Sequence, residues 1–152
     1  VVESWNGSSW TETTDIPTAT AALKGCGTQT LGLVAGGQTP SFTTASFEWD
    51  GSSWTSGGSM NTGRSTMAQA GIQTAAVFAG GSPGSPGATE SYNGTSFTEV
   101  TDMNTGRAQL AGLGTGSTNG AALASGGYIS TDQTAVEEFT APVNTTVTFT
   151  AS

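Results

Sequence analysis

The side chains that commonly carry enzyme chemistry are scarce in this sequence. It contains no histidine, one cysteine (Cys26) and 11 acidic residues spread over 152 positions. Without histidine there is no Ser-His-Asp triad, and the sequence offers neither a zinc ligand set nor a phosphate-binding glycine loop. These residues predict a protein that is not an enzyme and that uses no cofactor.

The charged residues narrow the range of partners. Three cations (Lys24, Arg64 and Arg107) stand against 11 acids, and the net charge is −8. Nucleic-acid binding needs clustered lysine and arginine, so a nucleic-acid partner is not expected. No apolar run approaches the ~20 residues of a membrane-spanning helix. No charged-then-apolar leader is visible, so we expect either that a leader has been removed or that the sequence is a piece of a longer polypeptide.

Arg64 and Arg107 have a repeated setting. Each ends the same five residues, Met-Asn-Thr-Gly-Arg, at positions 60–64 and 103–107. One interpretation directs both guanidinium groups at an anionic ligand. The other has them bind backbone carbonyl groups and pack on a neighbouring aromatic ring. We favour the structural role and keep both arginines as candidate ligand contacts.

Acidic residues also recur at matching places. Glu3, Glu90, Glu137 and Glu138 each lie beside an aromatic residue of a repeated run. Calcium prefers several oxygen ligands, but the sequence has no Asp-x-Asp-x-Asp-Gly loop, and acids in separate repeats are too far apart to share an ion. We expect these carboxylates to be exposed to solvent and expect no metal site.

The single cysteine has a simple interpretation. Cys26 aligns with Ala70 and Leu113 when the repeats are superposed, which favours a small buried hydrophobic residue. A reactive thiol would need an activating neighbour, and the sequence has no histidine to provide one.

A repeated hairpin signature organises the chain. Residues 46–55 read Ser-Phe-Glu-Trp-Asp-Gly-Ser-Ser-Trp-Thr, in which an Asp-Gly pair suited to a tight turn separates two aromatic runs. Related sequences occupy residues 2–11 and 89–98, and a degraded copy occupies residues 136–139. The repeated aromatics are Trp5, Trp10, Trp49, Trp54, Tyr92, Phe97 and Phe139. We expect those of the first three hairpins to be buried between repeats.

A second pair of strand-like runs lies between the hairpins. A run rich in glycine and alanine precedes an apolar run that ends at a Gly-Gly pair, at residues 36–37, 80–81 and 126–127. Short apolar runs are typical of covered strands, and no stretch has the 3.6-residue period of an amphipathic helix. We predict an all-β domain over residues 1–152 with about 14 strands and no helix. It comprises four-stranded antiparallel units at residues 18–57, 62–101 and 106–152, with a half unit at residues 1–14.

One unit closely resembles the kelch-type repeat. The features in kelch order are Val77–Ala79 with Gly80-Gly81, Tyr92, Phe97, and Met103 with Arg107. The likeness covers nearly the whole chain, although Ile16 and Thr20 replace Met and Arg in the first unit and Phe97 replaces a tryptophan. The resemblance implies β-propeller blades and structurally used arginines. The copper-radical oxidases built on kelch repeats need His, Tyr and Cys ligands that this chain cannot supply.

The kelch resemblance also suggests a role and partners. The Asn-Gly-Ser-Ser-Trp variants look like repeats in predicted virion proteins of marine bacteriophages. We therefore expect a structural or attachment module of a virion or extracellular appendage, such as a phage tail or fibre. Its ligand surface would be the loops at residues 38–44, 82–88 and 128–134, with Tyr128 as a candidate contact. The alternatives are a carbohydrate-binding propeller that recognises a host surface glycan and a protein-interaction adaptor.

The predicted unit count implies assembly. Three and a half blades do not close a ring easily, and the hairpin at one end and residues 147–150 at the other would be unprotected edges. We expect these ends to pair with other copies of the chain, with other virion or appendage subunits, or with further segments of the same protein. Head-to-tail addition without closure would give a filament.

Overall fold

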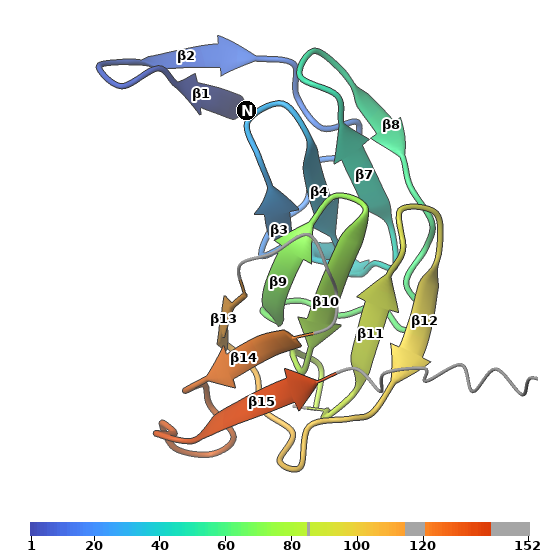
Figure 1. Cartoon of the computed structure of the whole chain (residues 1–152), viewed down its shortest axis with the longest axis vertical. Helices are drawn as coiled ribbons and strands as arrows, with labels where there is room; N and C mark the ends of the chain where they lie inside the picture. The colour runs from blue at the N-terminus through green and yellow to red at the C-terminus, as the bar shows by residue number, and fades with distance from the viewer. Residues whose placement is uncertain (85, 115–120, 141–152) are drawn as a thin grey trace, which may run out of the picture.

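The computed structural model describes residues 1–84, 86–114 and 121–140. They form 15 β-strands, and no helix occurs among them (Figure 1). No helix able to cross a membrane is found in this described part of the chain. The predicted all-β fold is confirmed.

The strands form antiparallel sheets of consecutive strands, as the hairpin signatures predict. The N-terminal sheet contains β1 (Val2–Trp5) and β2 (Trp10–Thr13). The first four-stranded sheet has the order β3 (Lys24–Gly27), β4 (Gly32–Ala35), β7 (Ser46–Trp49) and β8 (Trp54–Ser56). The second contains β9 (Ala68–Ile72), β10 (Ala75–Ala79), β11 (Thr89–Tyr92) and β12 (Phe97–Val100). The last contains β13 (Ala111–Leu113), β14 (Ala121–Ser125) and β15 (Val136–Thr140).

The strand count differs from the predicted number for two reasons. A short extra pair, β5 (Gln38–Thr39) and β6 (Ser41–Phe42), forms inside the loop at residues 38–44. The edge strand expected at residues 147–150 lies outside the described residues. Four antiparallel strands are confirmed for the units at 18–57 and 62–101.

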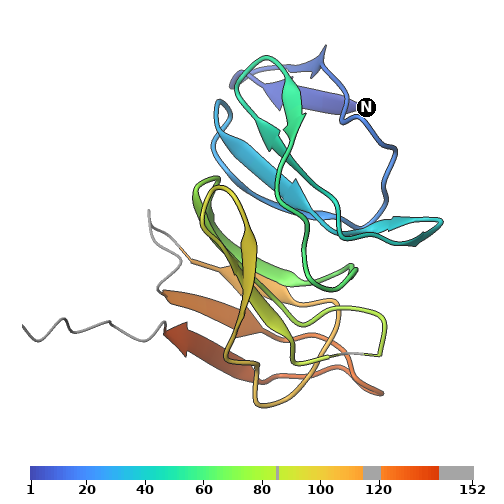
Figure 2. The ribbon, with the colours of Figure 1, turned by 90° about the vertical axis from the view of Figure 1, so that its right-hand side faces the viewer.

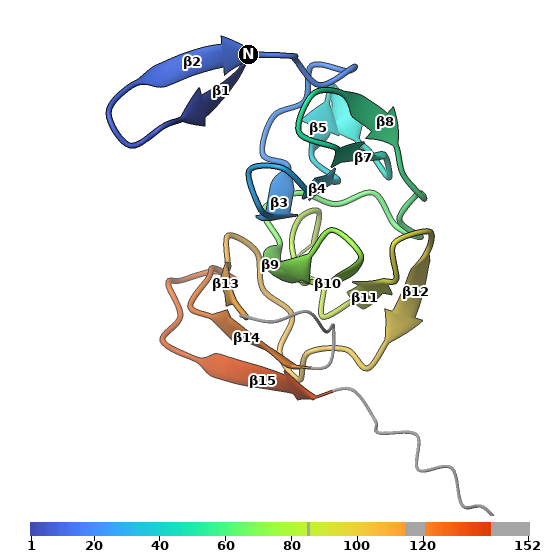
Figure 3. The ribbon, with the colours of Figure 1, turned by 45° about the horizontal axis from the view of Figure 1, so that its top comes forward.

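The sheets stack face to face in an arc. Strand β9 contacts both β3 and β13, so the first strands of the three larger sheets lie side by side. Figure 3 shows the N-terminal sheet set apart at one end of this arc. The described residues form an open arc and not a closed ring.

Apolar side chains fill the space between successive sheets. The larger cluster joins Leu33 and Ala35 of the first four-stranded sheet to Met60, Phe78 and Tyr92 of the second unit. A smaller cluster contains Ala68, Ala79, Leu110 and Ala124, with Met103 packed against it, and joins the second unit to the third. The two interfaces share several repeat positions, and Phe78 in the first is replaced by the smaller Ala124 in the second.

The Gly-Gly pairs directly follow the second strand of each of the three larger sheets, as predicted, and the first two pairs contact the next unit. Gly80 and Gly81 have φ angles of +69° and +113°, values that L-residues with side chains rarely adopt. A Cβ atom at Gly80 would lie 2.5 Å from the carbonyl oxygen of Arg107. The Gly81 N–H donates to this same oxygen at 2.8 Å. Glycine here allows the close backbone contact that joins successive units.

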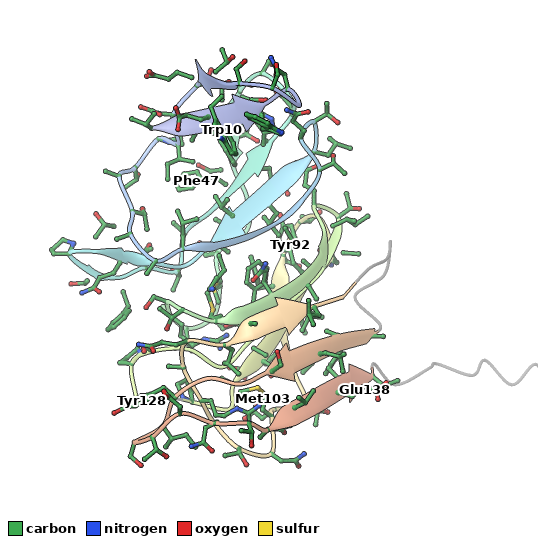
Figure 4. All side chains as sticks on the ribbon, turned by 90° about the vertical axis from the view of Figure 1, so that its left-hand side faces the viewer. Trp10, Phe47, Tyr92, Met103, Tyr128 and Glu138 are labelled. Carbon is green, nitrogen blue, oxygen red and sulfur yellow. The ribbon has the colours of Figure 1, made fainter. Side chains whose placement is uncertain are left out.

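The burial predicted for the hairpin aromatics is right within the stack and wrong at its end. Trp49, Tyr92 and Phe97 are at most 8% exposed, and Trp54 is half-buried. Trp5 and Trp10 are 44% and 64% exposed, because no described sheet precedes theirs, whereas Leu33 and Ala35 of the preceding sheet pack with the equivalent Tyr92 and Phe97. Figure 4 shows Trp10 at one end of the stack and Tyr92 within it.

Candidate interaction surface

Three loops emerge from the same side of the arc. The first residue of each loop exchanges two backbone hydrogen bonds with another residue of the same unit. That residue directly follows the position that Arg64 and Arg107 occupy in their units. The bonded pairs are Ala21 with Gln38, Ser65 with Ser82, and Ala108 with Tyr128, at 2.8–3.0 Å. Figure 2 shows the three loops projecting together on one side of the ribbon. The repeated bridges thus fix three loops of different sequence on one surface.

Tyr128 lies at the start of the third loop, as predicted, and is 42% exposed. Its backbone bridges Ala108 on one side and Asp132 on the other. Ile129 beside it is also 42% exposed. The side-chain amide of Gln133 donates to the backbone carbonyl oxygen of Thr131 at 2.9 Å, and this bond closes the loop on itself. The result is an ordered turn with an accessible aromatic and apolar pair.

Arg64 and Arg107 lie away from this accessible surface, because both side chains are 0% exposed. Arg64 Nη1 donates to the carbonyl oxygens of Gly80 and Ala88 at 2.7 and 2.6 Å. Arg107 Nε donates to the carbonyl oxygen of Gly126 at 2.9 Å. These contacts confirm the carbonyl binding of the structural interpretation, and the complete burial argues against a ligand contact at either arginine.

Each arginine also binds a glutamate in the sheet of its own unit. Arg64 Nη2 donates to Glu90 Oε1 at 2.7 Å, while the backbone and side-chain nitrogens of Asn61 donate to Glu90 Oε2 at 2.7 and 2.9 Å. Glu90 is only 1% exposed. We call this group of Asn61, Arg64 and Glu90 the first clasp. It ties the turn before β9 to β11, two strands away.

The second clasp repeats the arrangement one unit later. Arg107 Nη1 donates to Glu137 Oε1 at 2.6 Å, and the Asn104 N–H donates to Oε2 at 2.6 Å. Burial tends to raise the pKa of Glu137, but the hydrogen bonds from Arg107, Asn104 and Thr105 outweigh it and hold the pKa below its ordinary value. The carboxylate is therefore stabilised in its charged form.

The solvent exposure expected for the repeated acids is wrong for Glu90 and Glu137. Each lies opposite an arginine, where charge-assisted hydrogen bonds offset the cost of burial. Glu3 and Glu138 are exposed, as expected.

The first unit lacks every component of a clasp. Pro17 occupies the position of Asn61 and has no N–H to donate, and Thr20 occupies the position of Arg64. Phe47, 9% exposed, occupies the position of Glu90. Donors and acceptor are thus replaced together. This joint replacement was the sequence signal that could have identified the clasps.

Cys26 is half-buried against the larger core cluster, and burial raises the pKa of its thiol to about 11. A thiol protonated at neutral pH is consistent with a packing role. Among the described residues, no group of three or more His, Cys, Asp or Glu side chains could hold a metal ion.

Comparisons with known proteins show the fold alone. No protein-family model matches the sequence, and no curated protein sequence matches it. The solved structure of YjhT is similar to this chain with a TM-score of 0.69 and 18% sequence identity, over 84% of the chain. The matched region covers 45% of the YjhT chain, so this chain spans less than half of that protein's length.

Proposed function

We propose that the stacked sheets are kelch-like propeller blades and that the chain is a non-enzymatic attachment module of a virion or extracellular appendage. The observation that carries the proposal is the set of three loops held on one side by the same backbone bridge in each unit. A rigid repeated scaffold that presents loops of different sequence is a common design for recognition.

The distribution of charge supports this proposal. Two of the three cations are enclosed in clasps and are therefore not available on the surface. The loops at residues 38–44 and 82–88 contain no charged residue, and that at 128–134 contains only Asp132. Contacts through these loops would therefore depend on polar groups and on the exposed Tyr128 and Ile129.

The location can be tested directly. Antibodies against the chain should label purified virions or surface appendages from samples that carry the gene, and mass spectrometry of those particles should recover its peptides. Recovery only from the cytoplasmic fraction would contradict the proposal.

The role of the loops needs a second test. Replacing residues 128–134 with the sequence of residues 82–88, a loop of equal length, should abolish binding to the target surface and leave the unfolding midpoint nearly unchanged. Unchanged binding would exclude this loop as the recognition element. The reverse replacement, of residues 82–88 by residues 128–134, is the matched control for scaffold damage.

A carbohydrate-binding role is the second candidate. Tyr128 is exposed in a turn that also holds Asp132 and Gln133, and an aromatic face beside polar groups is typical of sugar sites. A glycan array should then show binding that Tyr128→Ala removes. Trp10→Ala, a change at an exposed aromatic of the N-terminal sheet, is the control and should leave binding intact.

A further inference from the structure

The two interfaces that join the three larger sheets differ at one repeat position. In the first interface this position holds Phe78 of β10, which is 0% exposed and lies opposite Glu90 in the strand pairing. In the second interface it holds Ala124 of β14, which lies opposite Glu137, the acid of the second clasp. At this position the second interface therefore has a methyl group where the first has a phenyl ring.

A cavity of about 190 Å³ lies between the second and third of these sheets. Ala124 lines it from β14, and Ala68 and Ala79 line it from β9 and β10. Phe139 of β15 also lines the cavity and is only half-buried. Tyr92, at the same repeat position in the second unit, is 0% exposed and belongs to the same buried cluster as Phe78. The methyl group at position 124 thus leaves open a space beside an aromatic side chain.

The size and the lining of the cavity suit one aromatic ring. An apolar cavity of about 150 Å³ inside a protein is large enough to bind benzene. Val77 and Met103 add apolar wall to that of the alanines, and Figure 4 shows Met103 beside the strands of the third sheet. A ring bound here would bury apolar surface and contact Phe139, and both effects favour binding.

The polar part of the lining restricts the charge of a ligand. It includes Asp102, Asn104 and Glu138, and all three are exposed. The lining contains no cation, and the net charge of the protein is −8. Asp102 Oδ1 accepts the Thr89 N–H at 3.2 Å, while Oδ2 accepts no hydrogen bond from the described residues. An anionic ligand would therefore be repelled, and a hydroxyl group can donate to Asp102.

We propose that this cavity binds an uncharged aromatic compound of one ring that carries a hydroxyl or hydroxymethyl group. The ring would lie next to Ala124 and Phe139, and the hydroxyl group would donate to Asp102. The inference goes beyond the attachment function and does not depend on it.

Alanine methyl groups report on the two interfaces separately. Benzyl alcohol and benzoate are suitable probes because they have nearly the same size and only benzoate is charged. In NMR titrations of the whole chain with labelled alanine methyl groups, benzyl alcohol should shift the signals of Ala68, Ala79 and Ala124, with a dissociation constant of about 1 mM. The signals of Ala35 and Ala76, in the first interface, should not move. Benzoate should bind at least about tenfold more weakly.

Three variants test the position of the ligand. Ala124→Phe places a ring where the second unit has Phe78, so it should abolish binding and keep or raise the thermal midpoint. Leu113→Phe adds a ring at a 60% exposed residue that does not line the cavity, and it should leave the dissociation constant unchanged. Asp102→Asn keeps an acceptor for the Thr89 N–H but replaces Oδ2 by an amide nitrogen, so it should weaken binding about fivefold.

Four results would overturn the proposal. They are unmoved signals at the three alanines of the cavity, equal binding of benzoate, unchanged binding by Asp102→Asn, and a thermal midpoint that Ala124→Phe lowers by more than about 5 °C. The last result would mean that the space beside position 124 is already filled in solution. None of these results bears on the particle-labelling or loop-exchange tests of the attachment function.

Discussion

The same outer hairpin occurs in two different settings, in the second four-stranded sheet and in the N-terminal sheet. In the second sheet, Tyr92 is 0% exposed and Glu90 is 1% exposed. In the N-terminal sheet, the larger Trp5 and Trp10 are 44% and 64% exposed. The hairpin sequence alone therefore does not determine burial. The surroundings of the hairpin determine it: the turn before β9 supplies the donors for Glu90, and Leu33 and Ala35 of the preceding sheet pack with Tyr92.

The largest expected difference between the two sheets is in how much the free energy of unfolding depends on the equivalent glutamates, Glu90 and Glu3. Glu90→Ala leaves the Arg64 guanidinium buried without its carboxylate and should lower the free energy of unfolding by roughly 3–5 kcal/mol. Glu3→Ala removes an exposed carboxylate and should change it by less than about 0.5 kcal/mol. Urea denaturation measures both values. Equal effects would mean that burial of the acid does not distinguish the two sheets.

The first unit provides a control for the clasp result. Replacing Asn61, Arg64 and Glu90 together by the Pro, Thr and Phe of the first unit removes donors and acceptor at once. This triple variant should be more stable than Glu90→Ala, because no unpaired buried charge remains. A triple variant less stable than the single one would show that the three residues do not act as a unit.

A second comparison concerns core packing. Phe78 is 0% exposed, and Phe78→Ala should cost roughly 3–4 kcal/mol of stability through the cavity that it leaves. Val34 occupies the same repeat position on β4 and is half-buried, so Val34→Ala should cost about 1 kcal/mol. The same denaturation experiment gives both numbers. If the two costs match once side-chain size is considered, burial at this position does not distinguish the two units.

Two Gly-Gly pairs can be compared: Gly80 lies close to the backbone of the next unit, and Gly126 does not within the described residues. Gly80 and Gly126 have similar positive φ angles, +69° and +62°, so alanine should cost about 1–2 kcal/mol at either position. At Gly80 the added Cβ would also lie 2.5 Å from the backbone of the next unit, whereas at Gly126 its nearest neighbour would be 3.6 Å away. Gly80→Ala should therefore lower the thermal midpoint clearly further than Gly126→Ala. Similar midpoints would remove the close approach as the reason for glycine.

The smallest expected effect is the pH dependence of the second clasp. Because the folded protein lowers the pKa of Glu137, the clasp contributes stability that is complete well above the ordinary value of 4.5 and is lost as the pH falls through the folded pKa. Glu137→Gln should reduce the loss of stability below about pH 4.5, as measured by denaturation from pH 7 to pH 3. An unchanged slope would show that Glu137 has the same pKa in the folded and unfolded states.

The sequence predicts the periodic features of this fold well. The hairpins, the four-strand units and the Gly-Gly positions follow from local turn chemistry and spacing, which each repeat contains in full. The exposure of Trp5 and Trp10 could not be predicted from these features, because the cover of such aromatics comes from strands far from them in sequence, as Leu33 of β4 packs with Tyr92. Pairing of Arg64 with Glu90 was missed because the two residues are 26 positions apart, and each has a common explanation when considered alone.

The absence of a clasp in the first unit has a consequence for folding. Neighbouring repeats of similar sequence risk exchanging hairpins on the way to the native state. If the β7–β8 hairpin paired with the strands that follow Arg64, Phe47 would leave a buried guanidinium without its acid. If the β11–β12 hairpin paired with the strands that follow Thr20, Glu90 would be buried beside Pro17 without a donor. Both errors bury an uncompensated charge, so the difference between the units selects against misassembly.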